Sequence, residues 1–119
     1  MAPTANLPIY RSAYRLVQHL HQSTRKAPRD LRYTLVQRLL DESVEVCVDI
    51  ADANRNTGPA RSELLAALQR RIGRVDTLLA IAREQHCLST GAAAVAMSHM
   101  DELGKQAHGW AKSNSGHGN

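Results

Sequence analysis

The sequence has 119 residues and is 43% hydrophobic, which is enough for one domain with its own core. Aromatic residues make up only 3% and Phe is absent, so aliphatic side chains must fill that core, a composition that suits packed helices better than sheets. Fifteen Lys and Arg against eleven Asp and Glu give a net charge of +4. Most of these bases are Arg, whose planar guanidinium matches phosphate or carboxylate.

Several classes of protein are disfavoured at once. No apolar run approaches the ~20 residues needed to span a bilayer, and the N-terminus lacks the layout of a signal peptide. The two cysteines, Cys47 and Cys87, are too few for a disulfide framework. We therefore expect a cytoplasmic protein in which Cys47, on an apolar helical face, serves as a small core residue.

Helical periodicity begins at Leu7 or Pro8, because Pro is tolerated in the first turn of a helix. The first predicted helix ends by Gln22, and its apolar positions are Ile9, Ala13, Leu16, Val17 and Leu20. A second helix is predicted from Pro28 to a Gly- and Pro-containing break over residues 54–59. Its apolar face comprises Leu35, Val36, Leu39, Leu40, Val46, Cys47 and Ile50.

The third predicted helix follows Pro59 and stops near His86. Its apolar residues recur in steps of three and four, the spacing of a helix-packing seam: Leu65, Leu68, Ile72, Val75, Leu79 and Ala82. Ser89 is placed to cap a fourth helix, whose apolar positions are Ala96, Met100, Leu103, Ala107 and Trp110. The pattern predicts an all-α, up-down-up-down four-helix bundle over residues 7–113, with a short tail over 1–6 and a flexible tail over 114–119.

The charged residues are unevenly distributed. One face of the second predicted helix carries an acidic stripe, which is either solvated or a docking surface for a basic partner: Asp41, Glu42, Glu45, Asp49 and Asp52. Many bases, by contrast, have no acid three or four residues away on their own helix, or cluster around the first loop beside Asp30 alone. These candidate binding residues are Arg11, Arg15, Arg25, Lys26, Arg29, Arg70, Arg71 and Arg74. An anionic partner would relieve their repulsion, either nucleic-acid phosphate or the acidic stripe of another subunit.

Sequence signatures of catalysis are missing. There is no Glu-x-x-His pair of a carboxylate-bridged metal bundle, no Gly-rich phosphate loop, no Gly-x-Ser-x-Gly elbow and no Cys-x-x-Cys. We therefore expect no enzyme activity, no metal and no cofactor.

Two segments carry a family resemblance. Residues 32–38 (RYTLVQR) shortly follow Pro28, and residues 101–113 read DELGKQAHGWAKS. Both resemble the accessory variability determinant family of diversity-generating retroelements, four-helix-bundle proteins related to ribosomal RNA intervening-sequence proteins. The resemblance extends from about Leu7 to Ser113. The chain departs from the family pattern at His108, where the family often carries a glycine.

This resemblance implies a function. Members of the family are basic bundles that assemble as pentameric, ring-like barrels and bind the element's reverse transcriptase and template RNA, supporting mutagenic cDNA synthesis. We expect this chain to be such a non-catalytic accessory protein, binding RNA or DNA and the enzyme through its basic residues. The alternative is a structural homo-oligomer that docks a protein partner without binding nucleic acid, its arginines pairing with the acidic stripe of the next subunit.

Overall fold

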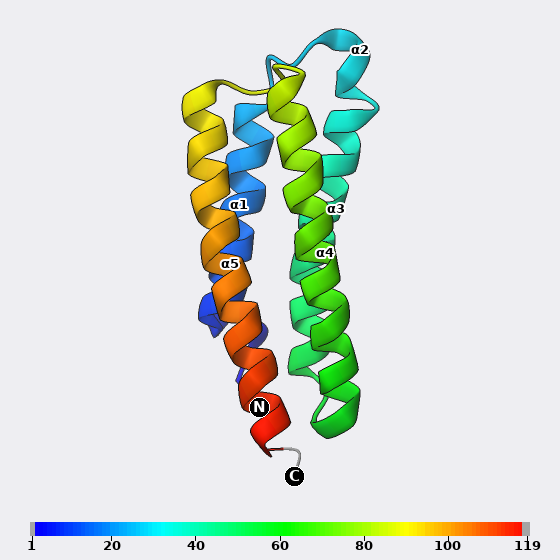
Figure 1. The fold of residues 1–119 in the computed structure, drawn as a ribbon, viewed down its shortest axis with the longest axis vertical. Coiled ribbons are helices and arrows are strands. Elements are labelled where there is room, and N and C mark those ends of the chain that lie inside the picture. Colours follow the sequence, from blue (N-terminus) through cyan, green and yellow to red (C-terminus); the bar gives the residue numbers. More distant parts are fainter. Residues whose placement is uncertain (1, 118–119) are drawn as a thin grey trace.

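The computed structural model describes residues 2–117 and is built from four long helices (Figure 1). These are α1 (Pro8–Ser23), α3 (Leu35–Asn54), α4 (Gly58–Glu84) and α5 (Thr90–His117). A 3₁₀ turn, η1 (Thr4–Asn6), precedes α1, and a four-residue helix, α2 (Arg29–Arg32), lies between α1 and α3. No strand occurs among the described residues, and the molecule measures 50 × 22 × 21 Å. The predicted all-α helical bundle is confirmed.

Each long helix packs on two neighbours. α1 and α4 each pack on α3 and α5, whereas α1 and α4 do not contact each other and so lie diagonally opposite in the bundle. The connections from α1 to α3 and from α4 to α5 lie at the same end of the molecule, and the α3–α4 loop lies at the other (Figure 1). Side chains on the outer faces of α1 and α4 therefore belong to different surfaces.

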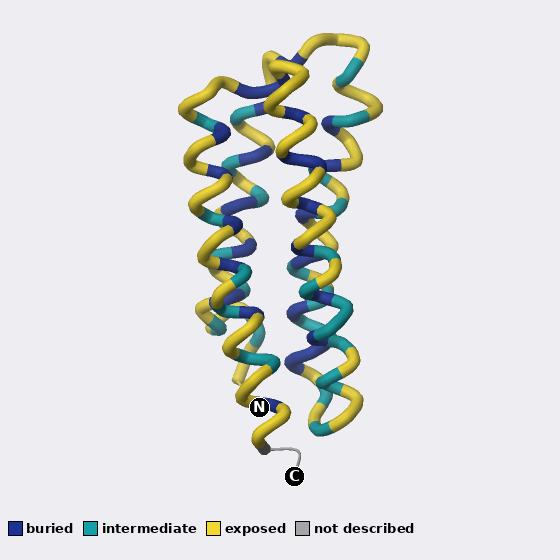
Figure 2. Tube along the Cα trace, viewed as in Figure 1, coloured by how far each residue is buried: buried dark blue, intermediate teal, exposed yellow. Residues whose placement is uncertain are grey.

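The core runs along the axis between the four helices (Figure 2). Every residue of the predicted seam of α4 is buried, as are Ala96, Met100, Leu103 and Ala107 of α5. Trp110 is half-buried and packs against this core. Cys47, predicted as a core residue, lies only at its edge, whereas Cys87 is buried. The spacing of apolar residues thus predicted the core correctly, but it assigned the buried cysteine to position 47, whereas the buried one is Cys87.

The second predicted helix is interrupted after its first turn. Residues 29–32 form α2, Thr34 leaves the helical region with φ −119° and ψ −93°, and α3 starts at Leu35. The Thr34 hydroxyl donates to the Asp30 carbonyl, and the Arg32 guanidinium donates to the carbonyls of Arg25 and Ala27. These side chains satisfy backbone oxygens locally, which stabilises a turn where periodicity alone predicted a continuous helix.

α5 continues to His117, so residues 114–117, which the sequence assigned to a flexible C-terminal tail, are helical. Asn114 is only 8% exposed, and its amide donates to the Gly58 carbonyl (3.1 Å) and to the Ser62 hydroxyl (2.8 Å). These bonds join the last turns of α5 to the start of α4. Residues 118–119 of the predicted tail lie outside the described residues.

The predicted N-terminal tail also has defined partners. The Asn54 amide at the end of α3 donates to the Ala2 carbonyl (2.8 Å) and to the Thr4 hydroxyl (3.1 Å). Residues 2–6 are therefore held against the end of the bundle, and Met1 lies outside the described residues.

The turn between α4 and α5 combines two helix caps. His86 adopts φ 58°, its amide donates to the Arg83 carbonyl, and the Cys87 amide donates to the Ala82 carbonyl, which together form a Schellman motif. The Ser89 hydroxyl accepts a bond from the Ala92 amide at 3.1 Å, so its predicted role as cap of the last helix is confirmed. His86 occupies the left-handed position that glycine usually fills.

Replacing His86 by Gly should therefore stabilise the fold. Relief of left-handed strain outweighs the extra backbone entropy of glycine, so we expect a gain of about 0.5–1 kcal/mol in the free energy of unfolding. Urea denaturation of H86G beside H86A tests this, because Ala keeps the Cβ and the strain. Equal stability of the two variants would contradict the strain argument.

Candidate nucleic-acid and partner interface

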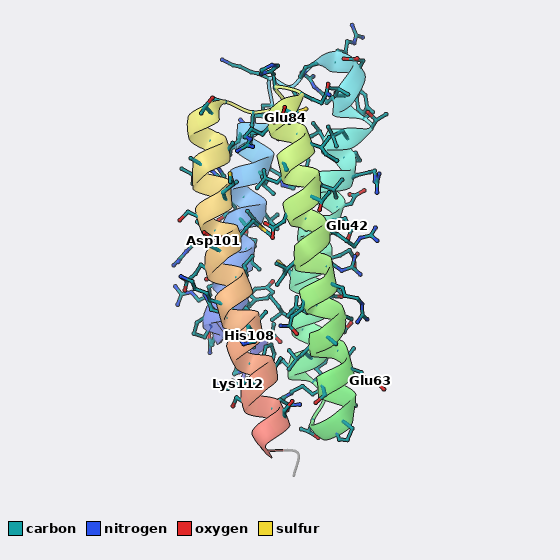
Figure 3. All side chains as sticks on the ribbon, in the orientation of Figure 1. Glu42, Glu63, Glu84, Asp101, His108 and Lys112 are labelled. Carbon is teal, nitrogen blue, oxygen red and sulfur yellow. The ribbon has the colours of Figure 1, made fainter. Side chains whose placement is uncertain are left out.

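Two of the candidate arginines on α4 are engaged within the chain. Arg71 reaches across to α3, where its Nε lies 2.6 Å from Oδ2 of Asp49 and its Nη1 pairs with Oε2 of Glu42. Arg74 adds a second guanidinium, with Nη2 2.8 Å from Oε1 of Glu42. Figure 3 shows Glu42 beside α4. The acids that Arg71 and Arg74 lack on their own helix are therefore on the neighbouring one.

This network is partly shielded from solvent. The Glu42 side chain is 14% exposed and that of Asp49 is 16% exposed. Burial acts to raise the pKa of Glu42, but hydrogen bonds and positive charge from Arg71 and Arg74 exceed that effect and hold the pKa below its ordinary value. The hydrogen bond to Asp49, with that to Glu42, raises the pKa of Arg71. Glu42 and Arg71 therefore stay charged at neutral pH.

The acidic stripe accordingly has two parts. Glu42 and Asp49 face α4 and are occupied, whereas Asp41 and Glu45 are exposed. Asp52 pairs with Arg55 at the end of its own helix, 2.9 Å apart. The arginines of α4 thus meet an acidic stripe of the same chain.

The remaining candidate bases are exposed. In the described part of the chain none of them has an ion pair: Arg11, Arg15, Arg25, Lys26, Arg29 and Arg70. Arg11 and Arg15 lie on the outer face of α1, one turn apart. Arg25, Lys26 and Arg29 follow in the loop and in α2, at the end of the bundle where α4 passes into α5. Arg70 lies on α4, diagonally across from α1, so it does not join this surface.

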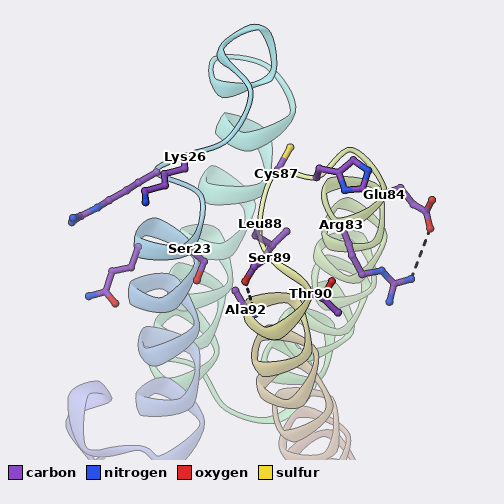
Figure 4. A pocket seen from close by; sticks show the side chains of 12 residues that line it. Ser23, Lys26, Arg83, Glu84, Cys87, Leu88, Ser89, Thr90 and Ala92 are labelled. Atoms are coloured by element: carbon purple, nitrogen blue, oxygen red, sulfur yellow. Dashed lines mark hydrogen bonds and ion pairs between the residues drawn. The ribbon is translucent and has the colours of Figure 1, made fainter.

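An open depression of about 1110 Å³ lies at that end of the bundle (Figure 4). Lys26 lies on its α1 side, whereas Arg83 and Glu84 lie on its α4 side. The Arg83 and Glu84 side chains form an ion pair there, with Nη2 of Arg83 4.0 Å from Oε1 of Glu84. The cations line opposite edges of the depression and do not converge on one point. This arrangement suits contacts to an extended anionic chain better than the capture of one small ligand.

Two histidines lie together between α1 and α5. The rings of His19 and His99 have centroids 5.9 Å apart, and Nε2 of His19 is 2.8 Å from the Ala92 carbonyl oxygen. Burial, followed by the charges of His19 and Arg15, lowers the pKa of His99. His19 and His99 are far apart in the sequence, so only tertiary packing brings them together.

The thiols are poorly suited to nucleophilic chemistry. Burial raises the pKa of Cys47 to about 11, and burial with the nearby Asp30 carboxylate raises that of Cys87. Within residues 2–117 no group of three or more His, Cys, Asp or Glu side chains is placed to hold a metal ion. None of the helices there has the length and apolarity required to cross a membrane.

The Gly- and Trp-containing segment of α5 has an open outer face. A Cβ added at Gly104 or Gly109 would meet no atom within 4 Å apart from the adjacent residues and backbone of α5 itself, so no other helix of the chain approaches closely there. His108 is exposed on the same helix (Figure 3). Trp110 instead receives the Arg61 guanidinium over its ring, 5.5 Å from the centroid.

Comparison with known proteins adds no assignment: no protein-family model matches the chain, and no curated protein shows significant sequence similarity to it.

Removing the carboxylate of Glu42 should destabilise the fold at neutral pH. We expect E42Q to lower the free energy of unfolding by about 1–2 kcal/mol, between the values of exposed and buried ion pairs. Because folding lowers the pKa of Glu42 from 4.5, its contribution is complete above that pH and is lost as pH falls through the folded-state pKa. The deficit of E42Q should therefore shrink under acid.

Urea denaturation at several pH values measures this deficit. E45Q is the matched control, since Glu45 is exposed on the same helix and has no ion pair in the described region. A deficit that stays constant well below pH 4.5 would show that Glu42 acts through packing and not through its charge.

Proposed function

We propose that this protein is a non-catalytic accessory subunit of a diversity-generating retroelement. In this role it binds the element's reverse transcriptase and template RNA, supporting mutagenic cDNA synthesis, and supplies no cofactor or catalytic residue of its own. The proposal includes a cytoplasmic location, and it rests on the resemblance of residues 32–38 and 101–113 to that family together with the charge distribution of the bundle.

The observation that carries the proposal is the uncompensated charge of one surface. Arg11 and Arg15 on α1, with Arg25, Lys26 and Arg29 beyond it, are exposed and have no acidic partner in the described region. On α3, Glu42 and Asp49 are already paired with arginines of α4. A polyanion such as RNA or DNA would compensate these charges, and so would an acidic surface of the reverse transcriptase.

We further propose an up-down-up-down bundle that assembles into a ring, following the pentamer of the family. Short connections at alternate ends support the topology. Exposed apolar side chains on several helices support self-association: Val44, Val48, Ile81, Val95 and Met97. The same side chains favour the second candidate, a structural homo-oligomer that docks a protein partner without nucleic acid.

Labelled RNA should bind in a strongly salt-dependent manner. We expect the logarithm of the association constant to fall linearly with the logarithm of salt, and R11Q or R15Q to reduce the slope by about 0.7–0.9 for each phosphate that the variant no longer neutralises. Fluorescence anisotropy over a salt series, with mass by light scattering on the same sample, provides both readouts.

R55Q is the matched control because it removes the same charge from an arginine outside the proposed surface. Arg55 lies at the C-terminal end of α3 and pairs with Asp52. If R55Q weakens RNA binding as much as R11Q does, the binding depends on the net charge of the protein and not on the position of Arg11. No RNA binding at low salt by an intact oligomer would reject the accessory role and favour the structural candidate.

The glycines of α5 test the assembly. Since neither Gly104 nor Gly109 is approached within the chain, we propose that another subunit packs on them. We expect G104A to raise the stability of the isolated helix bundle by up to about 1 kcal/mol while weakening the oligomer. Thermal unfolding and light scattering separate the two effects, and an unchanged mass with higher stability would remove this face from the interface.

A further inference from the structure

A shallow groove runs along the outer face of α1. It has a volume of about 510 Å³ and is lined by Ala5, Tyr10, Arg11, Tyr14, Arg15 and Gln18. Residues four apart on a helix lie one above the other, so the α1 residues form two adjacent rows. One row contains Tyr10, Tyr14 and Gln18, and the other contains Arg11 and Arg15. Aromatic rings and guanidinium groups therefore alternate along a single surface.

The two tyrosines of this groove differ in their role. Tyr10 is half-buried and packs against the hydrophobic core, whereas the Tyr14 residue is 51% exposed. The Tyr14 ring therefore contributes little to the core, although it presents a large apolar face to solvent. Such a ring is available to a ligand at little cost to folding.

The charged row is equally available. Arg11 and Arg15 are one helical turn apart, both are exposed, and neither has an ion pair with a described residue. Like charges at this spacing repel each other. An anionic group placed between them would remove that repulsion.

We infer that this groove binds an unpaired nucleotide of a single strand. The base stacks on Tyr14, the flanking phosphates contact Arg11 and Arg15, and the Gln18 amide is within the same groove to meet a base edge. An acidic peptide would satisfy the two arginines but would leave the Tyr14 ring without a stacking partner. A duplex offers phosphates but keeps its bases stacked and inaccessible.

This inference rests on the proposed nucleic-acid binding and narrows it to single-stranded segments. Anisotropy measurements with labelled oligouridine, a hairpin duplex and an abasic analogue of the oligouridine separate stacking from phosphate contact. We expect Y14A to weaken oligouridine binding by about 5- to 100-fold. Its affinity for the duplex and for the abasic strand should change by less than about twofold, since backbone contacts remain.

Two further variants keep the test specific. Y14F retains the ring and should retain oligouridine binding, and Y33A removes the most exposed tyrosine, which lies between α2 and α3, and should have no effect. Circular dichroism verifies that each variant is folded. Unchanged oligouridine affinity in Y14A, or an equal loss for oligouridine and duplex, would overturn the stacking assignment.

The outcomes also separate this inference from the proposed function. Wild-type protein that binds the duplex and the abasic strand as tightly as oligouridine would retain the proposed function and reject an unpaired-base site. A glutamate-rich peptide that displaces oligouridine equally well from Y14A and from the wild-type protein would assign the groove to a protein partner. Absence of binding to every RNA at low salt would reject both proposals.

Discussion

The apolar seam of α4 is the constraint on which the rest of the bundle depends. The most extensive helix contacts are those that α4 makes with α3 on one side and α5 on the other. The seam repeats in steps of three and four, and its leucines and valine at the centre are fully buried. In a chain without Phe, such interlocking aliphatic side chains must supply the packing density of the interior. They thereby fix which turn of α4 faces which turn of α3.

This register determines which positive charges remain free. Arg71 borders the seam residues Leu68, Ile72 and Val75 on the surface of α4, so docking of the seam carries it to Glu42 and Asp49. Arg11 and Arg15 on the outer face of α1 have no ion pair in the described part of the chain, whereas Glu42 and Asp49 of α3 are paired with arginines of α4. Arginines that look equivalent in the sequence thus become internal cross-links on one helix and uncompensated surface charge on another.

Features that depend on residues close together in the sequence were easier to predict than features that depend on contacts between helices. The four long helices, the seam of α4 and the Ser89 cap were all predictable, because periodicity and capping act within a few residues of the chain. The break at Thr34 and the helical residues 114–117 were missed. Asn114 depends on partners in a different helix. The break at Thr34 depends instead on local bonds from side chains to backbone carbonyls, which the periodicity of apolar residues does not reveal.

The candidate site was predictable only in part for the same reason. Counting acids three and four residues away identified bases without an intrahelical partner, but that count is blind to acids on a neighbouring helix. Arg71 and Arg74 therefore looked as free as Arg11 and Arg15. The sequence places Tyr14 between Arg11 and Arg15 on the first helix, but it does not reveal that Tyr14 is exposed.

The difference in availability has an energetic consequence for binding. An anion that approaches Arg71 must replace bonds to two carboxylates that are themselves largely shielded from water, and leaving such acids unpaired is costly. An anion that approaches Arg11 and Arg15 displaces only solvent and relieves mutual repulsion. The same guanidinium chemistry thus stabilises the fold at the α3–α4 contact and favours an external partner on α1. Any polyanion that binds this bundle should accordingly contact α1 and the adjacent loop before it competes for the arginines of α4.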